Sequence, residues 1–256
     1  RSIHLVAEAS RRAFIDRAQH AGDPAFARIP LQELLSEEHA ARWRKSIDLQ
    51  RATTTLQARA AVRETTETTH VSVVDTEGNA VSLTFSLGDL FGSGIVVPGC
   101  GFFLNNAMSA ATLTAGSPDR DGLPQPAANA AEPRKRVASA MAPTIILDGE
   151  KLFMVIGTRG GPTIPTTLLQ VFLNVAVYGQ TLADAVAAPR YHHQATPDEI
   201  RFERGRGDPK LLRQLNEIGH GVREDEPMGD VHAILVGPGG LTAVADGRDG
   251  GAAGGY

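Results

Sequence analysis

TTHVSVVDTEGNAVSLTFSL, residues 68–87, decides the fold of this chain. Residues 71–75 are apolar enough for a strand and run into Thr-Glu-Gly-Asn at 76–79, a composition typical of a tight turn. Beyond the turn, apolar side chains alternate strictly with hydroxyl side chains: Val81, Leu83, Phe85 and Leu87 against Ser82, Thr84 and Ser86. This period of two predicts an antiparallel hairpin with one apolar and one hydroxyl-bearing face. The hydroxyl-bearing face points either into a functional site or toward solvent, and the pattern favours neither.

Downstream of this hairpin, the sequence predicts further strands and helices. Dense apolar runs at 144–147 and 151–156 flank an Asp-Gly turn and predict a hairpin buried at the centre of the fold. Gly157-Thr158-Arg159-Gly160-Gly161-Pro162 then opens onto a helix at 163–178, whose inward face we expect to be Leu168, Leu169, Phe172, Leu173 and Ala176. The remaining signals are a short helix capped by Thr181, a helix between Asp208-Pro209 and Gly219, and a hairpin over 233–246.

Upstream, the sequence predicts peripheral helices. Apolar residues recur at helical spacing over 4–20, and residues 31–35 and 36–49 also have a helical pattern, with Ser36 as a plausible N-cap. Residues 51–67 form a Thr-rich connector without either period, and residues 112–136 form a long loop rich in Pro and Gly that is a candidate lid. Together these elements predict one layered α/β or α+β domain.

The composition excludes several classes of function. The net charge of −4 over 256 residues provides no basic field for nucleic acid, and no apolar run approaches the length of about 18 residues that a membrane-spanning helix needs. Cys100 is the only cysteine, so no intrachain disulfide is possible, and we expect it to be a packing residue. The start at Arg1 lacks Met and the features of a signal peptide. Small-molecule chemistry is the class that remains.

Thr68 carries the most specific chemical possibility. Cleavage of the peptide bond before it would expose an α-amino group with a pKa of roughly 7.7 to 8.0, which can accept the proton of the hydroxyl on the same residue. Backbone N–H groups at Gly160 and Gly161, where the chain enters a helix, could hold the oxyanion of an acyl-transfer reaction. The residues alone also allow two simpler interpretations, a Thr-rich connector and a tight Gly-Gly turn.

Short motifs along the whole chain favour the interpretation of Thr68 as a nucleophile, because they occur in the order found in one known family. They are Thr68-Thr69-His70-Val71-Ser72-Val73-Val74-Asp75, Gly78-Asn79-Ala80-Val81-Ser82, Leu90-Phe91-Gly92-Ser93-Gly94, Leu104-Asn105-Asn106, Met141-Ala142-Pro143-Thr144-Ile145, Gly160-Gly161, Ile164-Pro165-Thr166-Thr167, Ala188-Pro189-Arg190-Tyr191-His192-His193-Gln194 and Gly254-Gly255-Tyr256. With them, residues 68–256 resemble the small subunit of the γ-glutamyltranspeptidase family, and residues 4–50 resemble the last helices of its large subunit.

The resemblance implies an α+β fold, the four-layer αββα sandwich of N-terminal-nucleophile hydrolases, with cleavage before Thr68. It divides the chain into the end of the large subunit with its connector, residues 1–67, and the small-subunit catalytic segment, residues 68–256. It implies no cofactor and no metal. The catalytic residues that it implies are the nucleophile Thr68, its supporting hydroxyl Ser86, and the oxyanion hole of Gly160 and Gly161; it implies structural roles for His192 and His193.

Departures from the family pattern concern the acyl donor. The family binds the α-ammonium and α-carboxylate of a γ-glutamyl donor with polar side chains, and of the matching positions here only Ser139 is still polar, whereas Gly88, Ala107, Ala110 and Ala140 are not. Ala110 stands where the ammonium-binding Asp belongs. A buried ammonium without a carboxylate costs several kcal/mol, so such a pocket disfavours γ-glutamyl groups. Asp89, Asp119 and Asp121 are the acidic residues that could substitute.

Three functions follow from the sequence. The first is γ-glutamyl transfer or glutathione hydrolysis through an acyl-threonine; the second is the same chemistry on a glutaryl or other N-acyl amide without an α-ammonium, as in the related cephalosporin acylases. The third is an uncleaved, non-catalytic binding protein. The expected partners are a small-molecule amide substrate and the remainder of the large subunit, which in the family supplies an arginine for the donor carboxylate. The residues leave the localisation open; the resemblance suggests a periplasmic or secreted protein, because bacterial family members are often so.

Overall fold

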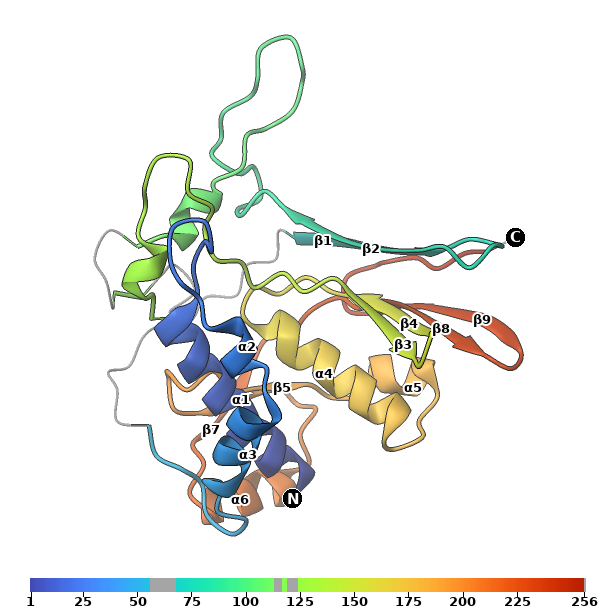
Figure 1. Cartoon of the computed structure of the whole chain (residues 1–256). Coiled ribbons are helices and arrows are strands. Elements are labelled where there is room, and N and C mark those ends of the chain that lie inside the picture. Colours follow the sequence, from blue (N-terminus) through green and yellow to red (C-terminus); the bar gives the residue numbers. More distant parts are fainter. Residues whose placement is uncertain (56–67, 113–116, 119–123, 256) are drawn as a thin grey trace. The chain divides into compact units, whose positions relative to one another are not determined.

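A computed structural model of the chain describes residues 1–55, 68–112, 117–118 and 124–255 (Figure 1). The chain forms two compact units, of which unit 1 comprises Arg1–Arg63, Ala107–Ser139 and Tyr191–Glu226, and unit 2 comprises Glu64–Asn106, Ala140–Arg190 and Pro227–Tyr256. The units group residues that are close in space, whereas the predicted boundary between residues 67 and 68 is a cleavage site. That boundary therefore stays a prediction.

Unit 2 is built on two antiparallel sheets. β1 (Thr68–Val74) and β2 (Ala80–Ser86) form the predicted hairpin, with Thr68 opposite Ser86 and Val74 opposite Ala80. The second sheet has the order β3-β4-β8-β9, from β3 (Thr144–Asp148), β4 (Lys151–Gly157), β8 (His232–Gly237) and β9 (Gly240–Ala245). The hairpins that were expected near 144–156 and 233–246 are thus both present.

The prediction that both strands of the 144–156 hairpin are central is wrong for β3. β4 lies between two strands, and Met154 and Val155, which point to opposite faces, are both 0% exposed. β3 pairs with β4 alone and is an edge strand, so Ile145 and Leu147 remain 45% and 57% exposed. An apolar run does not distinguish a central strand from an edge strand, since its burial depends on the neighbouring strand.

The hydroxyl-bearing face of the β1–β2 hairpin packs against the four-stranded sheet. Ser72 Oγ donates to the carbonyl of His232 in β8 at 3.0 Å, and Ser82 Oγ donates to the carbonyl of Ile156 in β4 at 3.1 Å. The opposite, apolar face is the exposed one; its side chains Val71, Val73, Val81, Leu83 and Phe85 are 43% to 54% accessible. The interpretation that the hydroxyl face points to solvent is therefore wrong. The hydroxyls instead bond the two sheets together.

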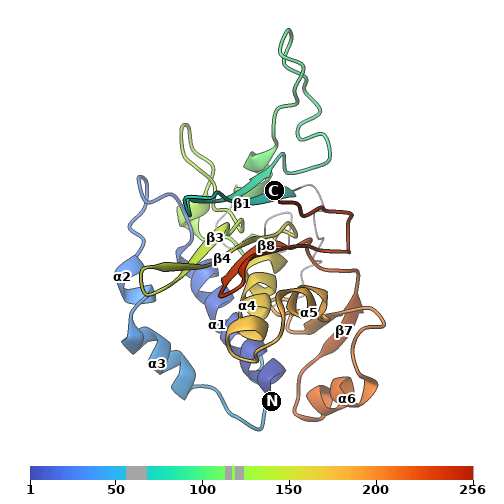
Figure 2. The ribbon, with the colours of Figure 1, turned by 90° about the vertical axis from the view of Figure 1, so that its right-hand side faces the viewer.

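α4 (Thr163–Ala176) and α5 (Leu182–Ala187) pack on the other face of the four-stranded sheet (Figures 1 and 2). Thr181 caps α5 as predicted, since its Oγ1 accepts the N–H of Asp184 at 3.1 Å. The predicted inward face of α4 is wrong in part. The buried apolar positions are Ile164, Leu168 and Val171, whereas Leu169 is 37% exposed. The buried face of α4 is rotated about the helix axis relative to the predicted one. The helix is apolar on several sides, so its periodicity alone does not determine which side faces the sheet.

Unit 1 combines helices with a small sheet. Its helices are α1 (Ser2–His20), α2 (Leu31–Leu34), α3 (Glu37–Lys45) and α6 (Pro209–Glu217); its 3₁₀ turns are η1 (Ala107–Ala110) and η2 (Ala127–Asn129); and its strands are β5 (Tyr191–His192), β6 (Ile200–Glu203) and β7 (Val222–Asp225). Ser36 caps α3 and Asp208 caps α6, as predicted. The core consists of Ala7, Ile200, Phe202 and Leu215 with their neighbours.

Two predictions about connecting segments fall largely outside the described residues. The Thr-rich connector is described only up to Thr55, and the 112–136 loop only at Thr112, 117–118 and 124–136. The described part of that loop contains the 3₁₀ turn η2, so it is not without secondary structure; its role as a lid stays a prediction. None of the helices in the part of the chain that the structure describes has the length and apolar character needed to cross a membrane.

Candidate active site

Thr68 and Ser86 meet at the open end of the β1–β2 hairpin. The hairpin register places them opposite each other, and the Thr68 hydroxyl donates to Ser86 Oγ at 3.1 Å. Ser86 Oγ also accepts the backbone N–H of Gly88 at 3.0 Å, which fixes its orientation. Thr68 is 7% exposed, so its hydroxyl is shielded from most solvent contact. The structure thus brings together the predicted nucleophile and its predicted supporting hydroxyl.

Gly160 and Gly161 carry free backbone N–H groups just before α4. Both have positive φ, 124° and 53°, and their carbonyls turn toward the helix, where they accept the N–H groups of Thr163 and Ile164 at 3.0 and 3.2 Å. Among the residues that the structure describes, neither glycine N–H donates to any group. Unpaired N–H groups at a helix start can bind negative charge, as an oxyanion hole requires.

The register of the two sheets places Thr68 at the end of unit 2 that holds this glycine pair. Ser82 in β2 contacts Ile156, and one step further along the hairpin the ring of His70 lies against Gly157. Thr68 and Ser86 are the next pair in the same direction, in which β4 continues into residues 158–161. The predicted nucleophile and the N–H groups of the glycine pair therefore lie at the same end of the packed sheets.

The predicted donor-binding residues are divided between the units. In unit 2, Gly88 follows β2 with a φ of 94°, and Ala140 begins the segment that leads to β3. Ala110 and Ser139 belong to unit 1, in which the carbonyl of Ala110 accepts Asn129 Nδ2 at 2.9 Å. The structure therefore joins Gly88 to the Thr68–Ser86 pair through a hydrogen bond, and it describes Ala110 and Ser139 as part of unit 1.

Asn129 is a residue of this region that the sequence did not single out. It is 1% exposed; besides Ala110 it contacts Gln125, and its Oδ1 accepts the N–H of Ala138 at 2.8 Å. It thus ties the segment before Ser139 to η1. A buried amide at the centre of a loop has no periodic signal, and only its partners reveal its role.

Comparison with known proteins decides the family. The family model described as gamma-glutamyltranspeptidase matches residues 1–256, the full length of the chain. The chain belongs to the γ-glutamyltranspeptidase family. The glutathione hydrolase proenzyme of Escherichia coli (strain K12) is 40% identical over 242 residues, and the acylase ACY 1 proenzyme of Pseudomonas sp. (strain SE83) is 33% identical over 247 residues. These matches cover 93% and 95% of this chain, which spans 42% of the length of each relative.

A solved member of the γ-glutamyltranspeptidase family confirms the fold class. The γ-glutamyltranspeptidase from Pseudomonas nitroreducens, complexed with L-DON, has a TM-score of 0.70 and 38% identity to this chain. The match covers 73% of this chain and 99% of that chain. The helix layer, the four-stranded sheet and the hairpin of unit 2 accordingly belong to the α+β, αββα architecture of N-terminal-nucleophile hydrolases.

His70 holds β1, the strand that begins at Thr68, on the second sheet of this γ-glutamyltranspeptidase-family chain. Its Nδ1 and Nε2 contact Thr84 Oγ1 and Ser72 Oγ at 2.7 and 3.0 Å, and its carbonyl accepts His232 Nδ1 at 2.7 Å. Burial, with the nearby His232, lowers the pKa of His70 to about 4, so the ring is neutral near pH 7. One signal of this role is present in the sequence, because alternation puts His70 on the same face as Thr68 and Ser72.

The two histidines that were expected to be structural are both buried in unit 1. His192 Nε2 contacts Gln194 Oε1 at 2.8 Å, and the ring packs edge-on against Phe14. Burial lowers the pKa of His192 and that of His193, which keeps both rings neutral near pH 7. These contacts are of the kind that a packing role requires.

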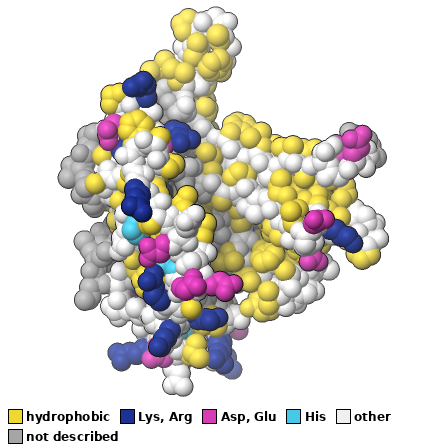
Figure 3. All heavy atoms as spheres, viewed as in Figure 1, with side chains coloured by type: hydrophobic (Ala, Val, Ile, Leu, Met, Phe, Trp, Pro, Cys, Tyr) yellow, Lys and Arg dark blue, Asp and Glu magenta, His cyan; other side chains and the backbone are white. Residues whose placement is uncertain are grey.

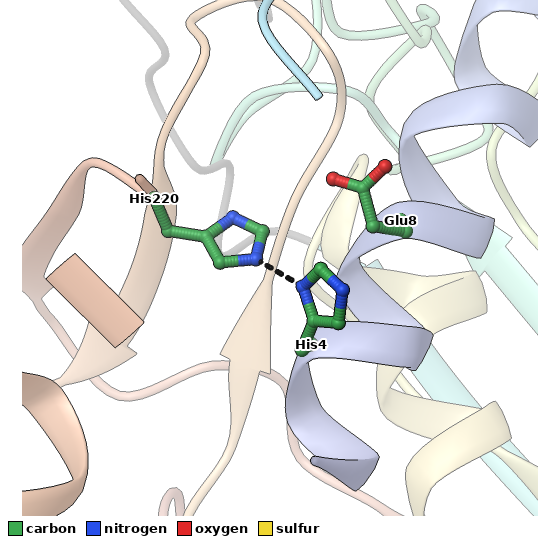
Figure 4. A group of neighbouring side chains, drawn as sticks. All are labelled: His4, Glu8 and His220. Carbon is green, nitrogen blue, oxygen red and sulfur yellow. Dashed lines mark hydrogen bonds between the residues drawn. The ribbon is translucent and has the colours of Figure 1, made fainter. Parts of the chain in front are cut away.

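His4, Glu8 and His220 form a second buried polar group in unit 1 (Figure 4). His4 Nε2 donates to the carbonyl of Asp48 at 2.8 Å, so its Nδ1 accepts from His220 Nε2, also at 2.8 Å. Glu8 is paired with two arginines through contacts of 3.3 Å and 2.6 Å. Three of the four imidazole nitrogens already have hydrogen-bond partners, and only His220 Nδ1 has none among the described residues. The two guanidinium charges also oppose a cation, so the donor set does not fit a metal site.

Proposed function

We propose that the chain is the C-terminal part of a self-cleaving amidohydrolase or acyltransferase that forms an acyl ester on Thr68. The observation that carries the proposal is the contact between Thr68 Oγ1 and Ser86 Oγ, at the sheet end that also holds the free N–H groups of Gly160 and Gly161. Family membership supports the same chemistry. The three relatives reported above are named as a glutathione hydrolase, an acylase and a γ-glutamyltranspeptidase, all of which are enzymes.

The proposed reaction uses the freed Thr68 amine as the base. Cleavage before Thr68 consumes one water and releases the amine, which then takes the proton of the Thr68 hydroxyl as its oxygen attacks the substrate carbonyl carbon. The N–H groups of Gly160 and Gly161 stabilise the oxyanion. The C–N bond breaks, the leaving amine takes the proton from the Thr68 ammonium, and the acyl ester passes to water or to an amine acceptor.

Mass spectrometry of the expressed proenzyme tests the proposal. We expect a fragment that begins at Thr68, and we expect Thr68→Ala to abolish both this fragment and amide hydrolysis. The variant Thr69→Ala is a matched control, because Thr69 is the neighbouring residue of β1 and its side chain points to the opposite, exposed face. A proenzyme that stays intact and inactive would support the non-catalytic function instead.

The exposed face of the β1–β2 hairpin supports a role for the remainder of the large subunit as a partner. Figure 3 shows hydrophobic side chains over this part of unit 2, where five apolar residues of the hairpin are 43% to 54% accessible. An apolar sheet face of this kind is stable when other protein covers it. Relatives are more than twice as long as this chain, which spans 42% of their length. We therefore infer that residues of the large subunit cover this face.

Two acyl donors are candidates for this site. A γ-glutamyl donor, as in glutathione, is the first, because the Escherichia coli relative at 40% identity is a glutathione hydrolase proenzyme. The second is a glutaryl or other N-acyl group without an α-ammonium, which the uncharged positions Gly88, Ala110 and Ala140 favour. Of the acidic residues that could substitute, Asp89 is exposed and accepts a hydrogen bond from Asn106 Nδ2 on one carboxylate oxygen, whereas Asp119 and Asp121 lie outside the described residues.

Anilides of the two acyl groups discriminate between these donors. If the pocket lacks an ammonium partner, glutaryl-anilide is turned over faster than γ-glutamyl-anilide, because a buried ammonium without a carboxylate costs several kcal/mol. The variant Ala110→Asp would then reverse the preference. Faster turnover of γ-glutamyl-anilide by the unsubstituted enzyme would refute the argument from Ala110 and leave the first donor.

A further inference from the structure

Thr158 joins the end of β4 to the glycine pair, and its side chain is completely buried. Its accessibility is 0%, and its hydroxyl makes two hydrogen bonds. Oγ1 accepts the backbone N–H of Asp230 at 2.8 Å and donates to the carbonyl of Arg159 at 2.9 Å. One hydroxyl thus connects a distant loop to the peptide bond between Arg159 and Gly160.

The bond to the Arg159 carbonyl fixes more than that oxygen. The Arg159 carbonyl and the Gly160 N–H belong to the same peptide unit, which is planar and trans, so that the two groups point in opposite directions. Holding the oxygen therefore also sets the direction of the N–H. Gly160 has a φ of 124°, a region open to glycine but not to other residues, so its own backbone does not restrict the peptide plane.

The loop on the far side of Thr158 is itself held in place. Gly229 approaches so closely that a Cβ there would lie 2.7 Å from Thr158 Oγ1 and 3.2 Å from the Arg159 carbonyl oxygen. Arg190 donates to the carbonyl of Met228 at 2.6 Å and pairs with Asp246 at 2.5 Å, with both side chains 2% exposed. Thr158 therefore contacts a loop whose position is held by the buried Arg190 and Asp246 pair.

We propose that Thr158 is a positioning residue, which aims the Gly160 N–H at the oxyanion that forms on an acyl group attached to Thr68. The proposal rests on the proposed function, because it assumes that the glycine pair is the oxyanion hole. Thr158 touches no reacting atom. It acts through the Arg159–Gly160 peptide, so its loss weakens binding of the transition state more than binding of the substrate.

The test compares Thr158→Val and Thr158→Ser in the cleaved, full-length enzyme, with kcat and KM measured for the anilide that the unsubstituted enzyme hydrolyses. Removal of a whole oxyanion donor lowers kcat about 100- to 1000-fold. A misdirected donor still provides part of the stabilisation, so we expect Thr158→Val to lower kcat by a smaller factor, roughly 30-fold. KM should change by less than about twofold, because ground-state binding is retained. Thr158→Ser keeps the hydroxyl and should retain kcat within about threefold.

Thr167→Val is the matched control, because Thr167 is also buried in unit 2, at 1% exposure, and does not contact residues 158–161 through any hydrogen bond that the described residues show. It should leave kcat unchanged. A boronic acid that forms a tetrahedral adduct with the Thr68 hydroxyl provides a second readout. Its affinity for Thr158→Val should fall by the same factor as kcat/KM, since such an adduct resembles the transition state.

If Thr158→Val folds poorly, Gly229→Ala displaces the same hydroxyl from the opposite side and should give the same loss of kcat. The proposal is overturned if Thr158→Val keeps kcat within twofold, if its loss appears in KM alone, or if Thr158→Ser loses as much as Thr158→Val. Failure of the proposed function looks different. In that case the unsubstituted enzyme already lacks Thr68-dependent hydrolysis.

Discussion

Ser86→Ala should slow the acylation of Thr68 while leaving the fold intact. The substitution removes the acceptor of the Thr68 hydroxyl at 3.1 Å and the acceptor of the Gly88 N–H at 3.0 Å. A hydrogen bond of this kind contributes about 0.5 to 1.5 kcal/mol net, so the two together contribute about 1 to 3 kcal/mol. If this energy orients the nucleophile, kcat falls about 5- to 160-fold, because each 1.36 kcal/mol of barrier is about tenfold in rate.

Ser82→Ala is the control that the hairpin offers. Ser82 lies on the same face of the same strand, and its hydroxyl donates to the carbonyl of Ile156 at 3.1 Å, away from Thr68. We expect it to lower the free energy of unfolding by about 1 kcal/mol without a change in kcat. The assay is single-turnover release of the aniline, which isolates acylation from the later hydrolysis of the ester. Equal single-turnover rates for Ser86→Ala and Ser82→Ala, both fully cleaved before Thr68, would refute the reasoning.

Three further predictions concern stability. Gly157→Ala should destabilise unit 2 by several kcal/mol, seen as a lower Tm, because its Cβ would lie 2.0 Å from the ring of His70; Gly237→Ala, with open space around it, should not. Asp246→Asn should cost about 3 to 5 kcal/mol by leaving the buried charge of Arg190 without its partner, and urea titration measures this; an unchanged midpoint would contradict it. The pKa of His70 is lowered to about 4 in the folded chain, so the unfolded chain binds more protons between about pH 6.5 and pH 4. The contribution of the buried, neutral His70 to the free energy of unfolding is therefore fully present above about pH 6.5 and is lost as the pH falls from about 6.5 to about 4. His70→Gln should flatten the pH dependence of Tm over the same range, and an unaltered slope would contradict the assignment.

The parts of the fold that depend on nearby residues were predictable from the sequence. The alternation in residues 81–87 predicted the hairpin, whereas the proximity of Thr68 and Ser86 was expected only from the family resemblance, because the predicted first strand began at residue 71 and β1 begins at Thr68. Ser36, Thr181 and Asp208 each cap the helix that follows, because a cap requires only residues within one turn.

The parts that depend on distant residues were not predictable. The strand β6 has the sequence Ile-Arg-Phe-Glu and is buried throughout, although half of its side chains are charged. Arg201 is tolerated there because Asp225 of β7 pairs with it at 3.0 Å, and that partner is distant in sequence. The contact of Thr158 with Asp230 was not predictable for the same reason, because Asp230 lies on another loop that is distant in sequence. Alternation likewise identified the two faces of the hairpin but not which of them is covered.

The predicted site residues come from both units, which has a consequence for how members of this family diverge. Thr68, Ser86 and the glycine pair all belong to unit 2, whereas Ala110 and Ser139 belong to the 107–139 segment of unit 1. If the 107–139 segment binds the acyl donor, as proposed, mutations in it alter which acyl group is accepted without disturbing the sheets that carry Thr68. A lineage could then exchange one substrate for another through a few loop substitutions. Proteins named glutathione hydrolase and acylase both stand among the relatives of this chain.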